Sequence, residues 1–146
     1  MKDPIKFIRK KILDTCSGSV TLDGSNVLFY NRVPSNANYP YVRVYGLSTS
    51  QIDDNQSKYN VECITRIEVV TRFLGDVGGD LDANDIMTQI MNLLITKNQS
   101  GFDLSADNFN CYSVTNNGVT YLQDDLTDHT YFRAILELSN KVEQIS

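Results

Sequence analysis

The stretch from Tyr59 to Phe73 constrains the fold of this chain more than any other part of the sequence. It reads YNVECITRIEVVTRF, alternates between apolar and polar side chains, and contains neither glycine nor proline. Successive side chains of an extended chain point to opposite faces. The alternation therefore predicts one long strand with an apolar face and a charged face. Such a strand is typical of the middle of an antiparallel sheet that is covered on one side only.

Two stretches with helical spacing flank this strand. The first is expected at about residues 3–14, where Asp3 and Pro4 suit a helix start and isoleucines recur on one face. The second, at about residues 80–96, carries a wide apolar face and is expected to pack on the long strand. The sequence thus predicts a single α+β domain over residues 1–146, an antiparallel β-sheet with two α-helices packed on one face.

The other elements are shorter and separated by turn-forming residues. Strands are expected at residues 27–30, 41–45, 109–115, 119–123 and 129–139, with a polar loop at residues 48–58. Asn116, Asn117 and Gly118 form a hairpin signal, because these residues tolerate positive φ. The polar residues 140–146 predict a flexible C-terminal tail.

The charge of the chain is unevenly distributed. The formal net charge is −5, but residues 1–11 hold five cations against one carboxylate, or +4, which leaves −9 for the remainder. A broad nucleic-acid-binding surface needs clustered Lys and Arg, so an acidic body argues against one. No apolar segment approaches the length of a membrane span, and we expect no membrane contact.

Catalytic and metal-binding patterns are weak in this sequence. The three cysteines, Cys16, Cys63 and Cys111, are widely spaced and are expected to be reduced thiols. Asp80 and Asp82 start like a calcium loop, but the required glycine and glutamate positions are occupied by other residues, so we interpret these carboxylates as helix caps. We expect no enzyme activity, no cofactor and no metal site.

The charged face of the predicted sheet is the more informative feature. It carries side chains of alternating sign that open two interpretations: a plain solvated surface, or a subunit interface in which opposite charges set the register. The second predicts inter-subunit contacts at Glu62, Arg66, Glu68, Arg72, Arg133 and Glu137.

The order of elements, together with two local motifs, resembles a known family. The motifs are Arg32-Val33-Pro34 followed by Tyr39-Pro40-Tyr41-Val42, and the helix sequence ANDIMTQI that begins at Ala83. The chain resembles the tail-completion and tail-terminator proteins of tailed bacteriophages. The resemblance covers roughly residues 1–140 in element order, and its specific part lies within residues 30–94.

The resemblance implies a structural virion protein that assembles into a ring, commonly a hexamer and alternatively a dodecamer. Such a ring lies at the tail end or at the head–tail joint (the neck), contacts connector, portal-proximal or tail-tube proteins, and lets DNA pass through its lumen without sequence-specific binding. Localisation in the virion after assembly in the host cytoplasm follows from it. The loops at 48–58 and 75–80 would then contact the tube or connector.

A second interpretation remains open. The same sheet face suits a non-enzymatic phage or bacterial adaptor that binds one other protein. A charge reversal at Arg66 and Glu68 would then abolish a heterologous contact and leave self-association unchanged.

Overall fold

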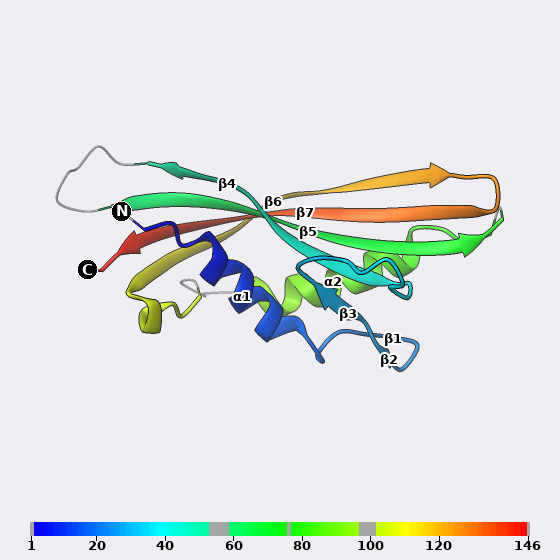
Figure 1. Cartoon of the computed structure of the whole chain (residues 1–146), viewed down its shortest axis with the longest axis horizontal. Helices are drawn as coiled ribbons and strands as arrows, with labels where there is room; N and C mark the ends of the chain where they lie inside the picture. The colour runs from blue at the N-terminus through cyan, green and yellow to red at the C-terminus, as the bar shows by residue number, and fades with distance from the viewer. Residues whose placement is uncertain (1, 53–58, 76, 97–101, 146) are drawn as a thin grey trace.

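The computed structural model describes residues 2–52, 59–75, 77–96 and 102–145. The long strands run the whole length of the molecule, and the two chain ends lie near each other at one end of the sheet (Figure 1). The elements, in chain order, are α1 (Ile5–Cys16), β1 (Thr21–Leu22), β2 (Ser25–Asn26), β3 (Leu28–Tyr30), β4 (Tyr41–Gln51), β5 (Asn60–Leu74), α2 (Leu81–Leu94), the 3-10 turn η1 (Ser105–Asp107), β6 (Phe109–Asp125) and β7 (His129–Gln144).

The long strand predicted at residues 59–73 is confirmed as β5, the central strand of a five-stranded sheet. The strand order is β3-β4-β5-β7-β6, so β5 lies between β4 and β7. Ile67 of β5 is paired with Val44 on one side and with Leu136 on the other. All three side chains are buried, as the alternation of β5 predicts for one face.

Both helices lie on this apolar face, which we call the inner face (Figure 1). At the start of α1, the Asp3 carboxylate accepts a hydrogen bond from Thr49 of β4, and Thr49 is paired with the buried Cys63. From α2, the Asn84 amide donates to the Tyr121 hydroxyl of β6 at 2.8 Å. One cluster of buried apolar side chains fills the space between sheet and helices. The predicted α+β class is therefore confirmed.

The helix boundaries differ from the expected ones by about one half-turn. α1 begins at Ile5, whose backbone N–H donates to the Asp3 carboxylate at 3.0 Å, and ends at Cys16, two residues beyond the expected end. α2 begins at Leu81 and ends at Leu94. The carboxylate of Asp80 makes no capping hydrogen bond at its start, so the expected capping role of that side chain is wrong.

The sheet is mixed, which corrects the expectation of a purely antiparallel one. β3 pairs with β4 in parallel, from Leu28 opposite Tyr41 to Tyr30 opposite Arg43. Residues 31–40 connect the two strands. They return the chain to the end of the sheet at which β3 begins, so that β4 runs in the same direction as β3. β4 also continues to Gln51, so the predicted loop at 48–58 begins later than expected, and residues 53–58 lie outside the described residues.

The predicted hairpin at Asn116–Gly118 is wrong. β6 runs without interruption from Phe109 to Asp125 and passes through these residues with a register shift against β7. Gly118 takes its positive φ of 125° inside this irregularity, and its N–H donates to the Asn116 side chain at 2.7 Å. A bulge uses the same positive-φ residues as a tight hairpin, which explains the error. The hairpin between β6 and β7 is made instead by residues 126–128.

The predicted flexible tail at 140–146 is also wrong for residues 140–144. β7 continues to Gln144, with Asn140 opposite Cys63 and Val142 opposite Val61 of β5. Both side chains of this β7 segment are fully buried. Polar residues that alternate with a single valine carry little strand signal, and the pairing that orders them comes from a segment far away in sequence.

Candidate functional site

The six charged residues predicted as a subunit interface all lie on one face of the sheet. In the register of β5 against β7, residues 62, 66, 68 and 72 alternate with buried ones, and residues 133 and 137 face the same way. This is the face opposite the helices, and we call it the outer face. No helix in the described part of the chain lies on it (Figure 1).

Three of the six residues are occupied by contacts within the chain at one end of this face. The Arg66 guanidinium donates two hydrogen bonds to Oε1 of Glu137, at 3.0 Å from Nε and 2.8 Å from Nη2. These two residues are directly opposite in the β5–β7 ladder. Nearby, Ser139 donates to the Glu62 carboxylate at 2.9 Å. The pairs fix the register of the two strands, so the alternating signs already have an intramolecular role.

Arg133 joins two carboxylates at the other end of the face. Its Nη2 lies 3.1 Å from Asp124 of the neighbouring β6, and its Nη1 lies 3.8 Å from Glu68 of β5. Glu68 is only 8% exposed, which leaves its charge largely dependent on this neighbour. The Arg133 Nε atom is buried and has no hydrogen-bond partner among the described residues.

Residues 31–40 cover this end of the outer face, which the sequence did not predict. The Tyr39 ring lies 5.1 Å from the Tyr41 ring and 5.7 Å from the Tyr131 ring, and the Arg72 guanidinium lies 4.3 Å from its centre. Beneath this segment Val70 is only 4% exposed. The available signal was the aromatic run around Pro40.

A basic hollow lies between residues 31–33 and the sheet, and we call it the arginine pocket. Its volume is about 420 Å³. It is lined by Asn31, Arg32, Val33, Tyr41, Arg43, Glu68, Val70 and Arg133. Burial is the main cause that raises the pKa of the Tyr41 hydroxyl, which stays protonated and able to donate. Three guanidiniums and a hydroxyl against one carboxylate make this a site for an anionic group.

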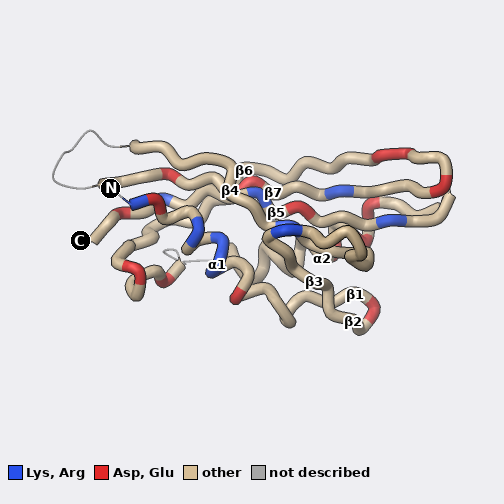
Figure 2. Tube along the Cα trace, in the orientation of Figure 1, with Lys and Arg blue, Asp and Glu red and all other residues tan. Residues whose placement is uncertain are grey.

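The opposite charge is concentrated at the tip of the β6–β7 hairpin (Figure 2). Asp124, Asp125 and Asp128 lie within five residues there, and we call residues 124–128 the acidic turn. Leu126 at its apex is 62% exposed. The end of β5 adds another exposed apolar side chain, Leu74, beside the turn, where Gly75 donates its N–H to the Asp128 carbonyl.

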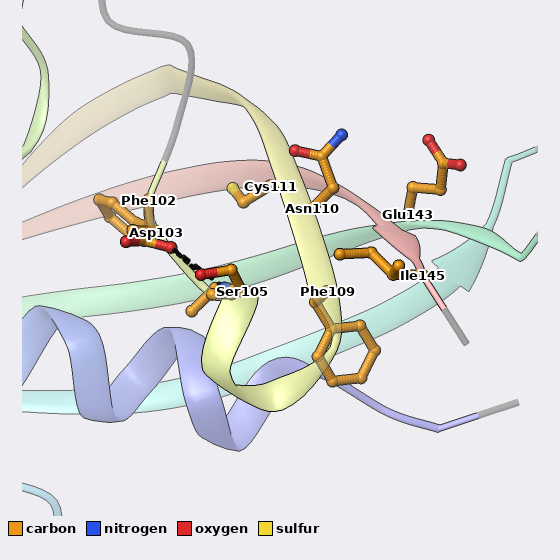
Figure 3. Close-up of a pocket in the computed structure, with 9 residues that line it drawn as sticks. Phe102, Asp103, Ser105, Phe109, Asn110, Cys111, Glu143 and Ile145 are labelled. Atoms are coloured by element: carbon orange, nitrogen blue, oxygen red, sulfur yellow. Dashed lines mark hydrogen bonds between the residues drawn. The ribbon is translucent and has the colours of Figure 1, made fainter.

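A second hollow, of about 460 Å³, lies at the opposite end of the molecule beside η1 (Figure 3). Its polar centre is a contact between Ser105 and Asp103, in which the hydroxyl donates to the carboxylate at 2.7 Å. This hydrogen bond is the main cause that lowers the pKa of Asp103, because it favours the charged form. A carboxylate stabilised in this way is a weaker base, so the pair is poorly suited to activating the serine.

The cysteines and carboxylates do not form a metal site in the described part of the chain. Cys16, Cys63 and Cys111 are free and buried, and no group of three or more potential ligands is placed to hold a metal ion among residues 2–52, 59–75, 77–96 and 102–145. Over the same ranges, no helix is long and apolar enough to cross a membrane.

No protein-family model matches this chain, and no curated protein matches it. Its function is therefore inferred from its fold and its surfaces.

Proposed function

We propose that this protein is a structural subunit of a tailed-phage virion that forms a ring at the tail end or the head–tail joint, through which DNA passes. The observation that carries the proposal is the division of the outer face. One end holds a basic pocket, while the hairpin tip beyond it is acidic and apolar. Unlike surfaces at different places on one chain favour head-to-tail contacts, and such contacts generate rings when the rotation closes.

The shape of the subunit supports the same proposal. β5 has 15 residues, which corresponds to about 50 Å of extended chain, whereas the 14 residues of α2 span about 21 Å. β5 is therefore longer than either of the two helices that lie on the sheet. β6 forms one edge of the sheet over 17 residues, with no proline or lysine to protect it. The unpaired N–H and C=O groups of such an edge are a template for pairing with another chain, and the register shifts of β6 against β7 interrupt this edge in two places.

The resemblance in the sequence gives the proposal its biological setting. The motif at residues 32–42 belongs to the segment that covers the outer face, and the motif at residues 83–90 belongs to the helix that supports the inner one. The first motif therefore supplies Arg32, Val33 and Tyr41 to the pocket, and the second lies on the opposite side of the sheet.

Negative-stain microscopy and sedimentation velocity of the purified protein test this proposal. We expect rings with a central opening, alone or with tail-tube or connector proteins added. A chain that stays monomeric at every concentration, with and without those partners, would contradict it.

An adaptor that binds one other protein through the outer face is the second candidate. Charge reversal at Arg66 and Glu68 distinguishes the two. An adaptor loses its heterologous partner and keeps its own association state. In a ring subunit, reversal disturbs the Arg66–Glu137 pair and the register of the outer face, and ring formation weakens.

A further inference from the structure

The arginine pocket lacks enough carboxylate to match its cations. Arg32, Arg43 and Arg133 contribute +3, whereas Glu68 and the Asp124 carboxylate that lies against Arg133 contribute −2, which leaves a net charge of +1. Arg133 divides its interactions between Glu68 and Asp124. Among the described residues, Arg32 and Arg43 form no ion pair, although Arg43 stacks on the Tyr45 ring at 4.2 Å.

An unpartnered donor provides a second, independent observation in this pocket. The Nε atom of Arg133 is buried without an acceptor among the described residues. A buried donor left in this state is costly, and native structures usually supply a partner from a ligand, a water molecule or another chain. The pocket therefore has both charge and hydrogen-bonding capacity for an incoming anionic group.

The acidic turn has the complementary chemistry. Asp124 is engaged by Arg133 of its own chain, whereas Asp125 and Asp128 are exposed and contribute −2. Leu126 between them is 62% exposed. An exposed leucine flanked by aspartates matches a pocket that has arginines together with the apolar side chains of Val33 and Val70.

We infer that the acidic turn of one copy of this chain seats in the arginine pocket of the next copy. Asp125 and Asp128 pair with the arginines, and Leu126 covers Val33 and Val70. This inference rests on the proposed function in taking a second copy as the partner, and it names the contact that would build the ring. Because the turn and the pocket are different surfaces, each copy uses one of each, so the contact is heterologous.

Two double variants test the two sides of this contact, the pocket and the turn, separately. The pocket variant is Arg32→Asp with Arg43→Asp, and the turn variant is Asp125→Arg with Asp128→Arg. All four side chains are exposed in the single chain, so both variants should fold, which circular dichroism and thermal unfolding check. A control variant, Lys10→Asp with Lys141→Asp, changes the net charge by the same amount as the pocket variant at exposed positions away from the pocket and the turn.

Sedimentation velocity of each variant alone and of their equimolar mixture tests the contact. We expect each variant alone to be monomeric, because its pocket and its turn then carry charges of the same sign, and we expect the mixture to associate. The intact turn of the pocket variant meets the intact pocket of the turn variant, and the reversed pocket and the reversed turn are again opposite in sign. The control variant should associate like the unmodified chain.

Two results would overturn the inference: both variants associate like the unmodified chain, or their mixture stays monomeric at high concentration. The proposed function has a separate outcome. Rings formed by the unmodified chain and by both variants would leave that function standing without this contact. Association in the mixture, with an unmodified chain that never closes into a ring, would support the contact and contradict the ring.

Discussion

Arg66 and Glu137 lie directly opposite each other in the central strand pair and share two hydrogen bonds through one carboxylate oxygen. Both were predicted to contact a neighbouring subunit, and the structure pairs them within the chain. The side chains are 36% and 35% exposed, so water screens the pair. Its main effect is on which residues of β5 and β7 face each other.

Replacing Arg66 with alanine should weaken folding modestly. Water screens a cross-strand ion pair at this exposure, so the free energy of unfolding in urea should fall only slightly. Lys141→Ala, on the same face, is the matched control and should change it by less. The charge-exchanged variant Arg66→Glu with Glu137→Arg should recover most of the loss, and a further loss in that variant would argue against the pair.

Two buried threonines on the inner face of β5 should respond in opposite ways to replacement by valine. The Thr65 hydroxyl is buried without a partner among the described residues, whereas Thr71 donates to the Phe132 carbonyl at 3.0 Å. Removing an unsatisfied hydroxyl should raise the free energy of unfolding, and removing a satisfied one should lower it, each by about 1 kcal/mol. Urea denaturation of Thr65→Val and Thr71→Val makes the comparison. The same sign for both would refute the assignment of partners.

Gly78 and Gly79 offer a similar contrast between adjacent residues. Gly78 has a φ of +88°, and a Cβ atom there would collide with the Phe73 ring, whereas a Cβ at Gly79 meets nothing within 4 Å. Gly78→Ala should therefore lower the free energy of unfolding by about 1–3 kcal/mol, because strain and overpacking add. Gly79→Ala should change it by less than about 0.5 kcal/mol. Thermal unfolding of the two variants side by side measures the difference.

Alkaline pH should destabilise the fold through its buried thiols. Burial raises the pKa of Cys16 and of Cys63 to about 12, from an ordinary value of 9.0. A raised pKa contributes stability that is present below pH 9 and is lost as the pH rises toward 12, because only the unfolded chain ionises there. Each thiol should lower the free energy of unfolding by up to about 1.4 kcal/mol per pH unit in that range.

Urea denaturation at pH 8, 9 and 10 measures this loss. The variant Cys63→Ala starts from a lower stability, because it leaves a cavity, but its decline with pH should be shallower than that of the unmodified chain. Equal slopes for the two proteins would mean that Cys63 does not contribute to the pH dependence.

The sequence predicted the structure correctly where a single segment carries its own periodic pattern of apolar residues. The alternation from Tyr59 to Phe73 predicted the central strand, and the spacing of Ile86 and Ile90 predicted the face that α2 buries. The same alternation placed Glu62, Arg66, Glu68 and Arg72 on one face, and the alternation of residues 129–139 did the same for Arg133 and Glu137. It could not reveal that Arg66 and Glu137 pair with each other, because their partnership depends on which strands are neighbours.

The errors arose where distant segments decide the structure. Gly118 is required at a bulge, and its neighbours alone do not distinguish a bulge from a hairpin. Asn140 is buried because β5 pairs with it across more than seventy residues of sequence. The arginine pocket was missed for the same reason, since Arg32 and Arg133 meet only when residues 31–40 fold over the outer face.

The order of strands in the sheet also has a consequence for the synthesis of this chain. β5 reaches full pairing only with β7, which ends at Gln144, so the central ladder joins residues as far apart as Asn60 and Glu143. Closing such long loops has an entropic cost that must be met before the contacts form. The nascent chain therefore holds its central strand without its second neighbour until β7 has been synthesised, and this strand is then open to chaperones or to wrong partners.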